Sequence, residues 1–226
     1  MFRCKLLVGI SIVAVLLMSV NAMAAYITVP VVNGGFEQPG TGKIKGWDGE
    51  TGVDIPGWSS DIAAFDSGVE SGGAGGSAYR GFLLGGMSPW GSTYPDPSVW
   101  QILPYRIKAG NQFALSVDAL DNWSQVGPGQ LQMTLFYIAP GGARTTIATQ
   151  TVNLTSTWTT YKLDVSDASA GIGGLLGIEL ANIPQPSRVP PGNTWINIDN
   201  VQIPEPATMA LLGLGGLSLL RIRKRR

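Results

Sequence analysis

Carboxylates are the side chains through which this chain of 226 residues could do catalytic chemistry, because it contains no histidine. Asp48, Glu50, Asp54 and Asp61 lie together in one acidic stretch. A glycosidase needs two carboxyl groups about 5–5.5 Å or 6.5–9.5 Å apart, and proximity along the chain sets neither separation. Acidic residues of loops are usually only solvated, so the sequence indicates no catalytic pair.

Other catalytic chemistries are excluded by composition. Without histidine there is no Ser-His-Asp or Cys-His nucleophile and no His-ligated metal centre. The one cysteine, Cys4, lies in a segment expected to be removed, which leaves no thiolate or disulfide. The glycine-rich run at 72–76 lacks the Lys-Ser/Thr and the helix of a phosphate-binding loop. The sequence therefore predicts a protein that is not an enzyme.

Tryptophan offers binding chemistry instead, since the chain has seven and aromatic faces stack on sugar rings. Four of them lie in or beside strand patterns, where burial is the expected role: Trp58, Trp100, Trp158 and Trp195. Other aromatics fall in expected loops beside Gly, Pro or Asn: Trp47, Trp90, Tyr94 and Trp123. Each could pack under its own loop or stack on a ligand, and Trp90, Tyr94 and Trp123 are the candidate sugar-binding residues.

The elements that must position these residues are strands. Apolar side chains alternate at Phe113, Leu115 and Val117, and again from Leu131 to Tyr137. Further strands are expected at 26–32, 62–66, 79–84, 98–103, 145–152, 158–165, 175–181 and 194–203. Long glycine-rich loops are expected at 39–52, 68–77 and 85–97. The sequence predicts an all-β domain, a jelly-roll sandwich, over residues 25–203.

The charge of this domain argues against nucleic acid as a partner. The whole chain is neutral, but residues 25–203 hold eight basic and fourteen acidic residues, a net charge of −6. An acidic domain without a basic stripe lacks the electrostatic footprint of a nucleic-acid-binding protein.

The two chain ends predict export. Residues 1–24 combine Arg3 and Lys5, an apolar stretch and a small-residue cleavage site before Ala25, as a signal peptide does; the alternative is a retained anchor. At the other end an apolar run at 207–220 predicts a short transmembrane helix of about 21 Å. A basic anchor follows it at Arg221, Arg223, Lys224, Arg225 and Arg226.

Pro204, Glu205 and Pro206, followed by this apolar run and basic cluster, closely resemble the PEP-CTERM sorting signal of Gram-negative bacteria that make extracellular polysaccharide. The same tail is also catalogued as an ice-binding protein C-terminal domain. The resemblance implies that residues 204–226 hold the precursor transiently in the inner membrane. An exosortase would then cut near the motif and pass the protein to the cell surface or extracellular matrix. A plain tail anchor is the alternative.

Short motifs resemble galactose-binding-like jelly rolls, a superfamily that includes many carbohydrate-binding modules. They are Asn33 to Glu37, Ile55 to Trp58, Val99 to Gln101, and Ile198 to Val201. The resemblance implies a structural calcium ion between the first and last strands, where Glu37 and Asp199 occupy the matching places. The alternative is that Glu37 caps a turn and Asp199 accepts hydrogen bonds from local backbone amides.

Two functions follow from these observations. The first is a non-catalytic surface or biofilm-matrix protein whose jelly roll binds extracellular polysaccharide. The second is a structural or adhesive matrix component that binds no glycan.

Overall fold

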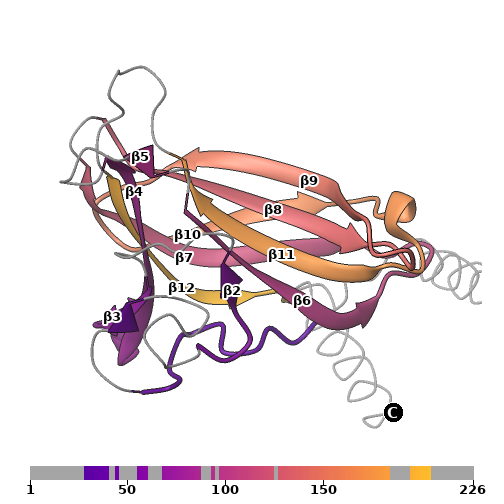
Figure 1. The fold of residues 1–226 in the computed structure, drawn as a ribbon, viewed down its shortest axis with the longest axis horizontal. Helices are drawn as coiled ribbons and strands as arrows, with labels where there is room; N and C mark the ends of the chain where they lie inside the picture. Colours follow the sequence, from indigo (N-terminus) through magenta and orange to yellow (C-terminus); the bar gives the residue numbers. More distant parts are fainter. Residues whose placement is uncertain are drawn as a thin grey trace, which may run out of the picture.

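Two antiparallel sheets packed face to face make up the domain in the computed structural model, which describes residues 28–40, 44–45, 55–60, 68–87, 93–94, 97–124, 127–183 and 194–204 (Figure 1). The signal-peptide segment, the apolar run and the basic cluster of the tail lie outside these residues. Within the described part of the chain, no helix is long and apolar enough to cross a membrane.

One sheet has seven strands in the order β1-β3-β4-β12-β7-β10, with β5 paired to β4. Its strands are β1 (Ile44–Lys45), β3 (Gly68–Ser71), β4 (Tyr79–Met87), β5 (Thr93–Tyr94), β7 (Phe113–Ser124), β10 (Thr159–Val165) and β12 (Thr194–Gln202). The other sheet has five strands in the order β2-β6-β11-β8-β9. Its strands are β2 (Ser59–Ser60), β6 (Ser98–Arg106), β8 (Gln130–Ile138), β9 (Arg144–Asn153) and β11 (Leu175–Asn182). Two short 3-10 turns, η1 (Ala74–Gly76) and η2 (Ser169–Gly171), complete the described elements.

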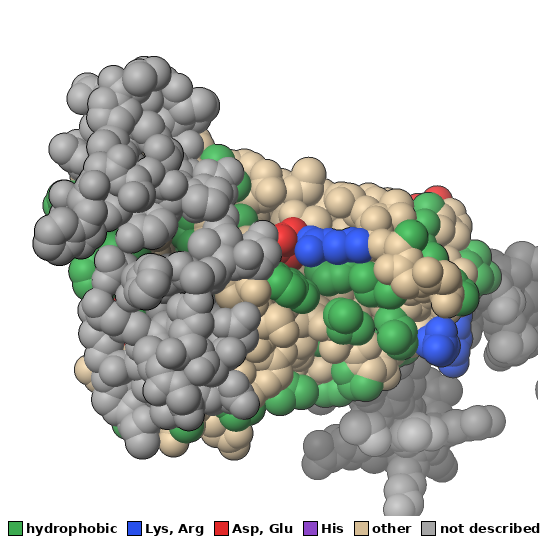
Figure 2. Space-filling model, viewed as in Figure 1, with side chains coloured by type: hydrophobic (Ala, Val, Ile, Leu, Met, Phe, Trp, Pro, Cys, Tyr) green, Lys and Arg blue, Asp and Glu red, His purple; other side chains and the backbone are tan. Residues whose placement is uncertain are grey.

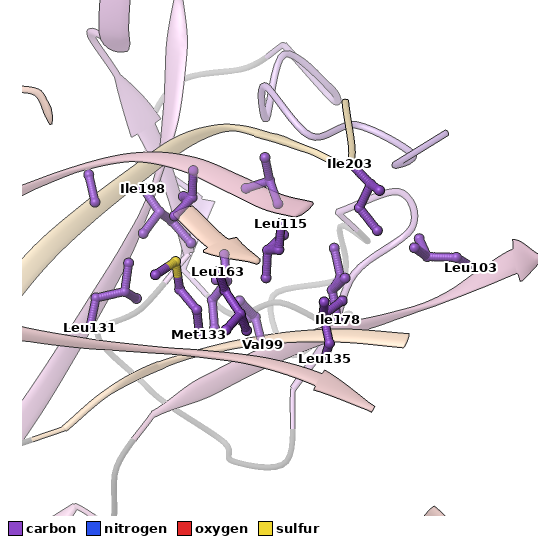
Figure 3. Packing of buried hydrophobic residues seen from close by; sticks show 14 of the residues in the cluster. Val99, Leu103, Leu115, Leu131, Met133, Leu135, Leu163, Ile178, Ile198 and Ile203 are labelled. Atoms are coloured by element: carbon purple, nitrogen blue, oxygen red, sulfur yellow. The ribbon is translucent and has the colours of Figure 1, made fainter. Parts of the chain in front are cut away.

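Alternation along each strand sends every second side chain into the core between the sheets. Leu131, Met133 and Leu135 of β8 have no exposed surface and lie opposite Leu115 of β7 and Ile198 of β12 (Figure 3). Burying a side chain of this size stabilises the fold by about 1.5–3 kcal/mol. Because no disulfide is available after Cys4, this apolar interior is what holds the sheets together.

The two ends of the domain meet at one point. Val29 and Ile203 form an isolated antiparallel bridge, with the Val29 N–H donating to the Ile203 carbonyl oxygen at 3.3 Å. Both side chains are 1% exposed and belong to the core. The chain therefore enters and leaves the sandwich side by side.

Eight of the predicted strands are confirmed, with shifted ends, as β4 and β6 to β12. The strand expected at 26–32 is wrong over its described part, since residues 28–32 make only the bridge at Val29. Pro30 has no N–H with which to continue a ladder. The loop expected at 68–77 begins instead with strand β3, which pairs with β4. The strand expected at 62–66 lies outside the described residues.

Candidate ligand-binding face

The five-stranded sheet turns one side to the core and the other side outward, and we call the second side the outer face. Strand register aligns its residues in three cross-strand rows over β6, β11, β8 and β9. The rows are Trp100, Glu179, Thr134 and Thr149; Ile102, Gly177, Phe136 and Thr146; and Arg106, Leu175, Ile138 and Arg144. Alternation on these strands thus gathers apolar, charged and hydroxyl groups on one surface.

A strap of three side chains crosses the centre of this face. The Phe136 ring, only 1% exposed, reaches over Gly177, where an added Cβ would lie 2.2 Å from the ring carbon Cζ. The Arg144 guanidinium lies 3.9 Å from the centre of the same ring and forms an ion pair with Glu179. Figure 2 shows a basic side chain lying beside an acidic one on this surface, above apolar side chains. Arg144 therefore spans from β9 across β8 to β11.

Apolar surface remains accessible next to the strap. Ile102 is 50% exposed, Pro104 is exposed, and Trp100 is half-buried and outside the core cluster. Isolated exposed apolar residues are ordinary, but here they adjoin an aromatic ring, an ion pair and a row of hydroxyl groups. The outer face can therefore offer stacking, hydrogen bonding and charge to one extended ligand.

Of the aromatics predicted to bind sugar, the two that the structure describes, Tyr94 and Trp123, belong to strands of the seven-stranded sheet. Trp123 is 50% exposed and belongs to β7 of the seven-stranded sheet, where it pairs with Trp195 of β12. It is a strand residue rather than a loop residue, because β7 continues along β12 to Ser124. The backbone of Tyr94 pairs with Gly86 in β5, and Trp90 lies outside the described residues. Their role in binding stays a prediction.

Sequence reasoning missed Trp100, which it assigned to burial because of its strand pattern. Trp58 is indeed core, at 4% exposed, whereas Trp100, Trp158 and Trp195 are only half-buried. The alternation of side chains along β6 could have shown that Trp100 faces outward. Val99 and Leu103 share the core side, so Trp100 belongs to the opposite side.

The resemblance motifs meet in one structural junction. The Val201 N–H donates to the Gly34 carbonyl oxygen at 2.9 Å, and the Trp58 indole N–H donates to the Asn33 carbonyl oxygen at 3.1 Å. The Phe36 and Trp58 rings pack with centres 5.3 Å apart. These motifs therefore hold the start of the domain against its last strand.

Glu37 and Asp199 lie at this junction, as predicted from their places in the sequence. The fully buried Asp199 carboxylate accepts hydrogen bonds from the Ala74 N–H at 2.7 Å, the Asn200 N–H at 2.7 Å and the Ser77 hydroxyl at 2.5 Å. Glu37 accepts one from the Tyr79 N–H at 3.2 Å. Desolvation raises the pKa of Asp199, and the nearby charge of Glu37 adds to the rise.

Of the alternative, in which Glu37 caps a turn and Asp199 bonds local amides, the structure shows one local bond, from the Asn200 N–H to Asp199, whereas Ala74, Ser77 and Tyr79 are distant in sequence. The chemical type of the nearby ligand atoms nevertheless suits calcium, because the atoms that could coordinate an ion there are oxygens. The Ser77 hydroxyl oxygen lies 3.0 Å from the Ala74 carbonyl oxygen and 3.4 Å from that of Tyr79, besides contacting Asp199. Within the described ranges, no group of three or more acidic, histidine or cysteine residues could hold a metal ion. Any ion would therefore depend on hydroxyl and carbonyl oxygens as well as on Glu37 and Asp199.

Fold and register define a jelly-roll β-sandwich. Residues 202–226 match the PEP-CTERM protein-sorting motif, so the chain carries this export and sorting signal. No curated protein matches the chain.

Several solved structures are similar to this chain at low sequence identity. A Stig cyclase, Fisc from Fischerella sp. TAU, is 17% identical with a TM-score of 0.55, covering 80% of this chain and 98% of its own. An arabinose-bound MgGH51 α-L-arabinofuranosidase is 14% identical with a TM-score of 0.52, covering 80% of this chain but 27% of that enzyme. The CBM22-1 xylan-binding domain of Paenibacillus barcinonensis Xyn10C is 13% identical with a TM-score of 0.46, covering 80% and 94%.

Proposed function

We propose that the chain is an exported, exosortase-sorted surface or matrix protein whose β-sandwich binds polysaccharide on the outer face without catalysing a reaction. The sorting motif at 202–226 supports export. The observation that carries the binding proposal is the apolar strip of Trp100 and Ile102 beside the Arg144–Glu179 ion pair. The domain then binds its ligand at the surface of a Gram-negative cell or in the biofilm matrix.

A sugar polymer fits the chemistry of this face. A pyranose ring has an apolar C–H side that stacks on an aromatic residue and a rim of hydroxyl groups that hydrogen-bond to polar side chains. Trp100 and Ile102 provide the first kind of contact. Thr146 and Thr149, both exposed in the same rows, provide the second.

The test is polysaccharide binding by Trp100→Ala. Loss of an aromatic platform is expected to weaken retention of the full-length protein on a binding polysaccharide by about tenfold, since base or sugar stacking contacts of this size contribute about 1–3 kcal/mol. Affinity electrophoresis measures this. The melting temperature should change little, because Trp100 lies outside the core cluster.

Trp123→Ala separates the two candidate surfaces. Retention that depends on Trp123 and not on Trp100 would move the site to the edge of the seven-stranded sheet. A wild-type protein that binds no polysaccharide would favour the structural or adhesive role without a glycan ligand.

The absence of catalysis is part of the proposal although some similar folds belong to enzymes. In the chain there is no histidine to serve as general base. On the outer face the carboxylate of Glu179 is already engaged by Arg144. This carboxylate is thus held by a partner within the domain, which supports a binding role for this surface.

We also propose a structural calcium ion at the junction, held by Glu37 and Asp199 with neighbouring hydroxyl and carbonyl oxygens. A cation there would neutralise two carboxylates that share one site. Excess calcium should raise the melting temperature of the protein and a chelator should lower it, because an ion that binds only the folded state stabilises it. Equal melting temperatures in both solutions would contradict the calcium ion and leave the two carboxylates with the backbone amides and the Ser77 hydroxyl as their partners.

A further inference from the structure

We propose that the ligand of the outer face is an anionic polysaccharide and that Arg144 binds the carboxylates of its sugar units. This inference rests on the proposed polysaccharide binding and adds the chemical class of the polymer. It follows from where the described charges lie and from how Arg144 is held.

The outer face carries a net positive charge, whereas the domain as a whole is negatively charged. Residues 25–203 carry a net charge of −6. The three rows of the outer face instead contain two arginines, Arg106 and Arg144, and one acid, Glu179. An anionic polymer that most of the domain repels therefore finds a local net charge of +1 on this surface.

Arg144 is held in a conformation suited to recognising a carboxylate. Its guanidinium stacks at 3.9 Å on the Phe136 ring, which fixes the plane of the group. Glu179 engages one edge of that plane through the Arg144 Nη2 atom. The ion pair shows that a carboxylate can approach the guanidinium on this face.

Donor groups of Arg144 remain for a ligand. A guanidinium has five N–H donors in a planar fork that matches a carboxylate. The hydrogen bonds of the described residues assign it one partner, Glu179, and its side chain is 39% exposed. The buried Phe136 ring holds the guanidinium flat, and the exposed edge of the fork can then meet the carboxylate of an acidic sugar.

Arg106 provides a second positive charge that could bind a carboxylate of the same polymer. It stands in one cross-strand row with Arg144, separated by Leu175 and Ile138. Three strand spacings place the two backbones about 14 Å apart. The Arg106 side chain is exposed and donates to the Gly173 carbonyl oxygen at 2.9 Å. A chain of several sugar units could thus meet two cations across one apolar row.

The experiment compares two forms of one polymer, in which methyl esterification removes the negative charge of the carboxyl groups. The full-length protein, purified in non-ionic detergent, is titrated with polygalacturonate and with its fully methyl-esterified form, using affinity electrophoresis and calorimetry. We expect at least tenfold tighter binding of the acidic form, falling as salt is raised from 50 to about 500 mM, because salt screens exposed charges. An uncharged glucan and polyglutamate complete the set of probes.

Arg144→Gln is the decisive variant, with Lys162→Gln as the matched control because Lys162 is exposed on β10 of the other sheet. We expect Arg144→Gln to lose most of the preference for the acidic form and Lys162→Gln to keep it. Arg144→Lys keeps the charge without the fork and should lose part of the preference. If Arg144→Gln melts well below wild type, Arg106→Gln provides the same comparison from the opposite end of the row.

Each remaining outcome overturns a specific statement. Equal affinity for both forms, or for the glucan, overturns the anionic class and leaves polysaccharide binding in place. Equal affinity for polyglutamate shows recognition of charge without sugar and overturns the inference. Binding of none of the polymers overturns the proposed function itself.

Discussion

At Asp199 a carboxylate with no exposed surface closes the junction between the last strand and the turn at 73–77. Gly73 is required there, since an added Cβ would lie 2.3 Å from the Asp199 Oδ2 atom and 2.0 Å from the Ser77 hydroxyl. Three hydrogen bonds compensate for part of the loss of water around the charge. The net effect of burial still favours the neutral acid, which raises the pKa of Asp199.

The raised pKa predicts the sign of a pH effect. A folded state that binds the proton more tightly than the unfolded state is stabilised at low pH, so the contribution of Asp199 is present below the ordinary pKa of 3.8. It is lost as pH rises through the raised folded value. The free energy of unfolding of wild type relative to Asp199→Asn should therefore fall as pH rises from 3.8 through the raised pKa of Asp199. Urea denaturation of residues 25–204 in calcium-free buffer measures this difference.

Asp167 is the control with the opposite sign. The Ser169 backbone N–H, which donates to Asp167 at 2.8 Å, lowers the pKa of this exposed carboxyl. Ionised Asp167 should therefore raise the free energy of unfolding of wild type relative to Asp167→Asn at pH values above its ordinary pKa. This difference should disappear as pH falls through the lowered pKa of the folded state. The same slope at both positions would contradict the assignment of Asp199.

The hydrogen-bond partners of a single residue are difficult to predict from sequence when they are distant along the chain. The places of Glu37 and Asp199 could be predicted because both belong to short motifs, one near the start of the domain and one on its last strand. Their partners could not, because Asp199 is bound by Ala74 and Ser77, which stand in a run that looked like a flexible glycine loop.

Between neighbouring strands, the packing of Phe136 over Gly177 joins β8 to β11. The ring occupies the space of the missing side chain, since three of its carbons would lie 2.2–2.8 Å from an added Cβ. Arg144 closes the other side of the ring. An aromatic residue on the outer side of a sheet is thereby buried without belonging to the core cluster.

Gly177→Ala should therefore displace the Phe136 ring and the strap above it. Overpacking of this kind costs about 1–3 kcal/mol in the free energy of unfolding. The displaced ring should also raise the exposure of Phe136 to solvent. Denaturant unfolding of residues 25–204 measures the cost.

Gly141→Ala is its control, because no atom lies within 4 Å of a Cβ added at that glycine and its φ angle is not positive. It should change stability by only a few tenths of a kcal/mol. Equal effects of the two substitutions would contradict the packing of Phe136 on Gly177.

Elements with long alternation were the ones that could be predicted. β7 and β8 each place apolar residues at every second position, and tertiary pairing only extended their ends. β12, which alternates at Ile196 and Ile198, ends one residue before the predicted end, at Gln202. The two-residue strands β1, β2 and β5 carry too few residues for a period to show. β3 pairs Gly68 with Phe82 of β4, a contact that composition alone assigned to a loop.

In the whole molecule, the sorting signal begins where the core ends. Ile203 is 1% exposed and is bridged to Val29, while Pro204, the next residue, is half-buried and closes the described domain. From the sequence, Pro204 and Pro206 are expected to disfavour helix at this point. A protease could therefore act after Ile203 without opening the sandwich.

The last prediction concerns where that cut can fall. We expect mass spectrometry of the surface fraction to find a mature chain that has lost Arg221 to Arg226 and retains Ile203, because an exosortase acting near Pro204, Glu205 and Pro206 leaves the Val29–Ile203 bridge intact. A purified domain ending at Pro204 should then melt at the temperature of the mature protein. One ending at Val201 should be less stable by about 2–5 kcal/mol, since it loses a buried isoleucine side chain. A surface form that keeps the basic cluster would rule out processing, and equal stability of the two truncated domains would show that the bridge contributes nothing to closing the sandwich.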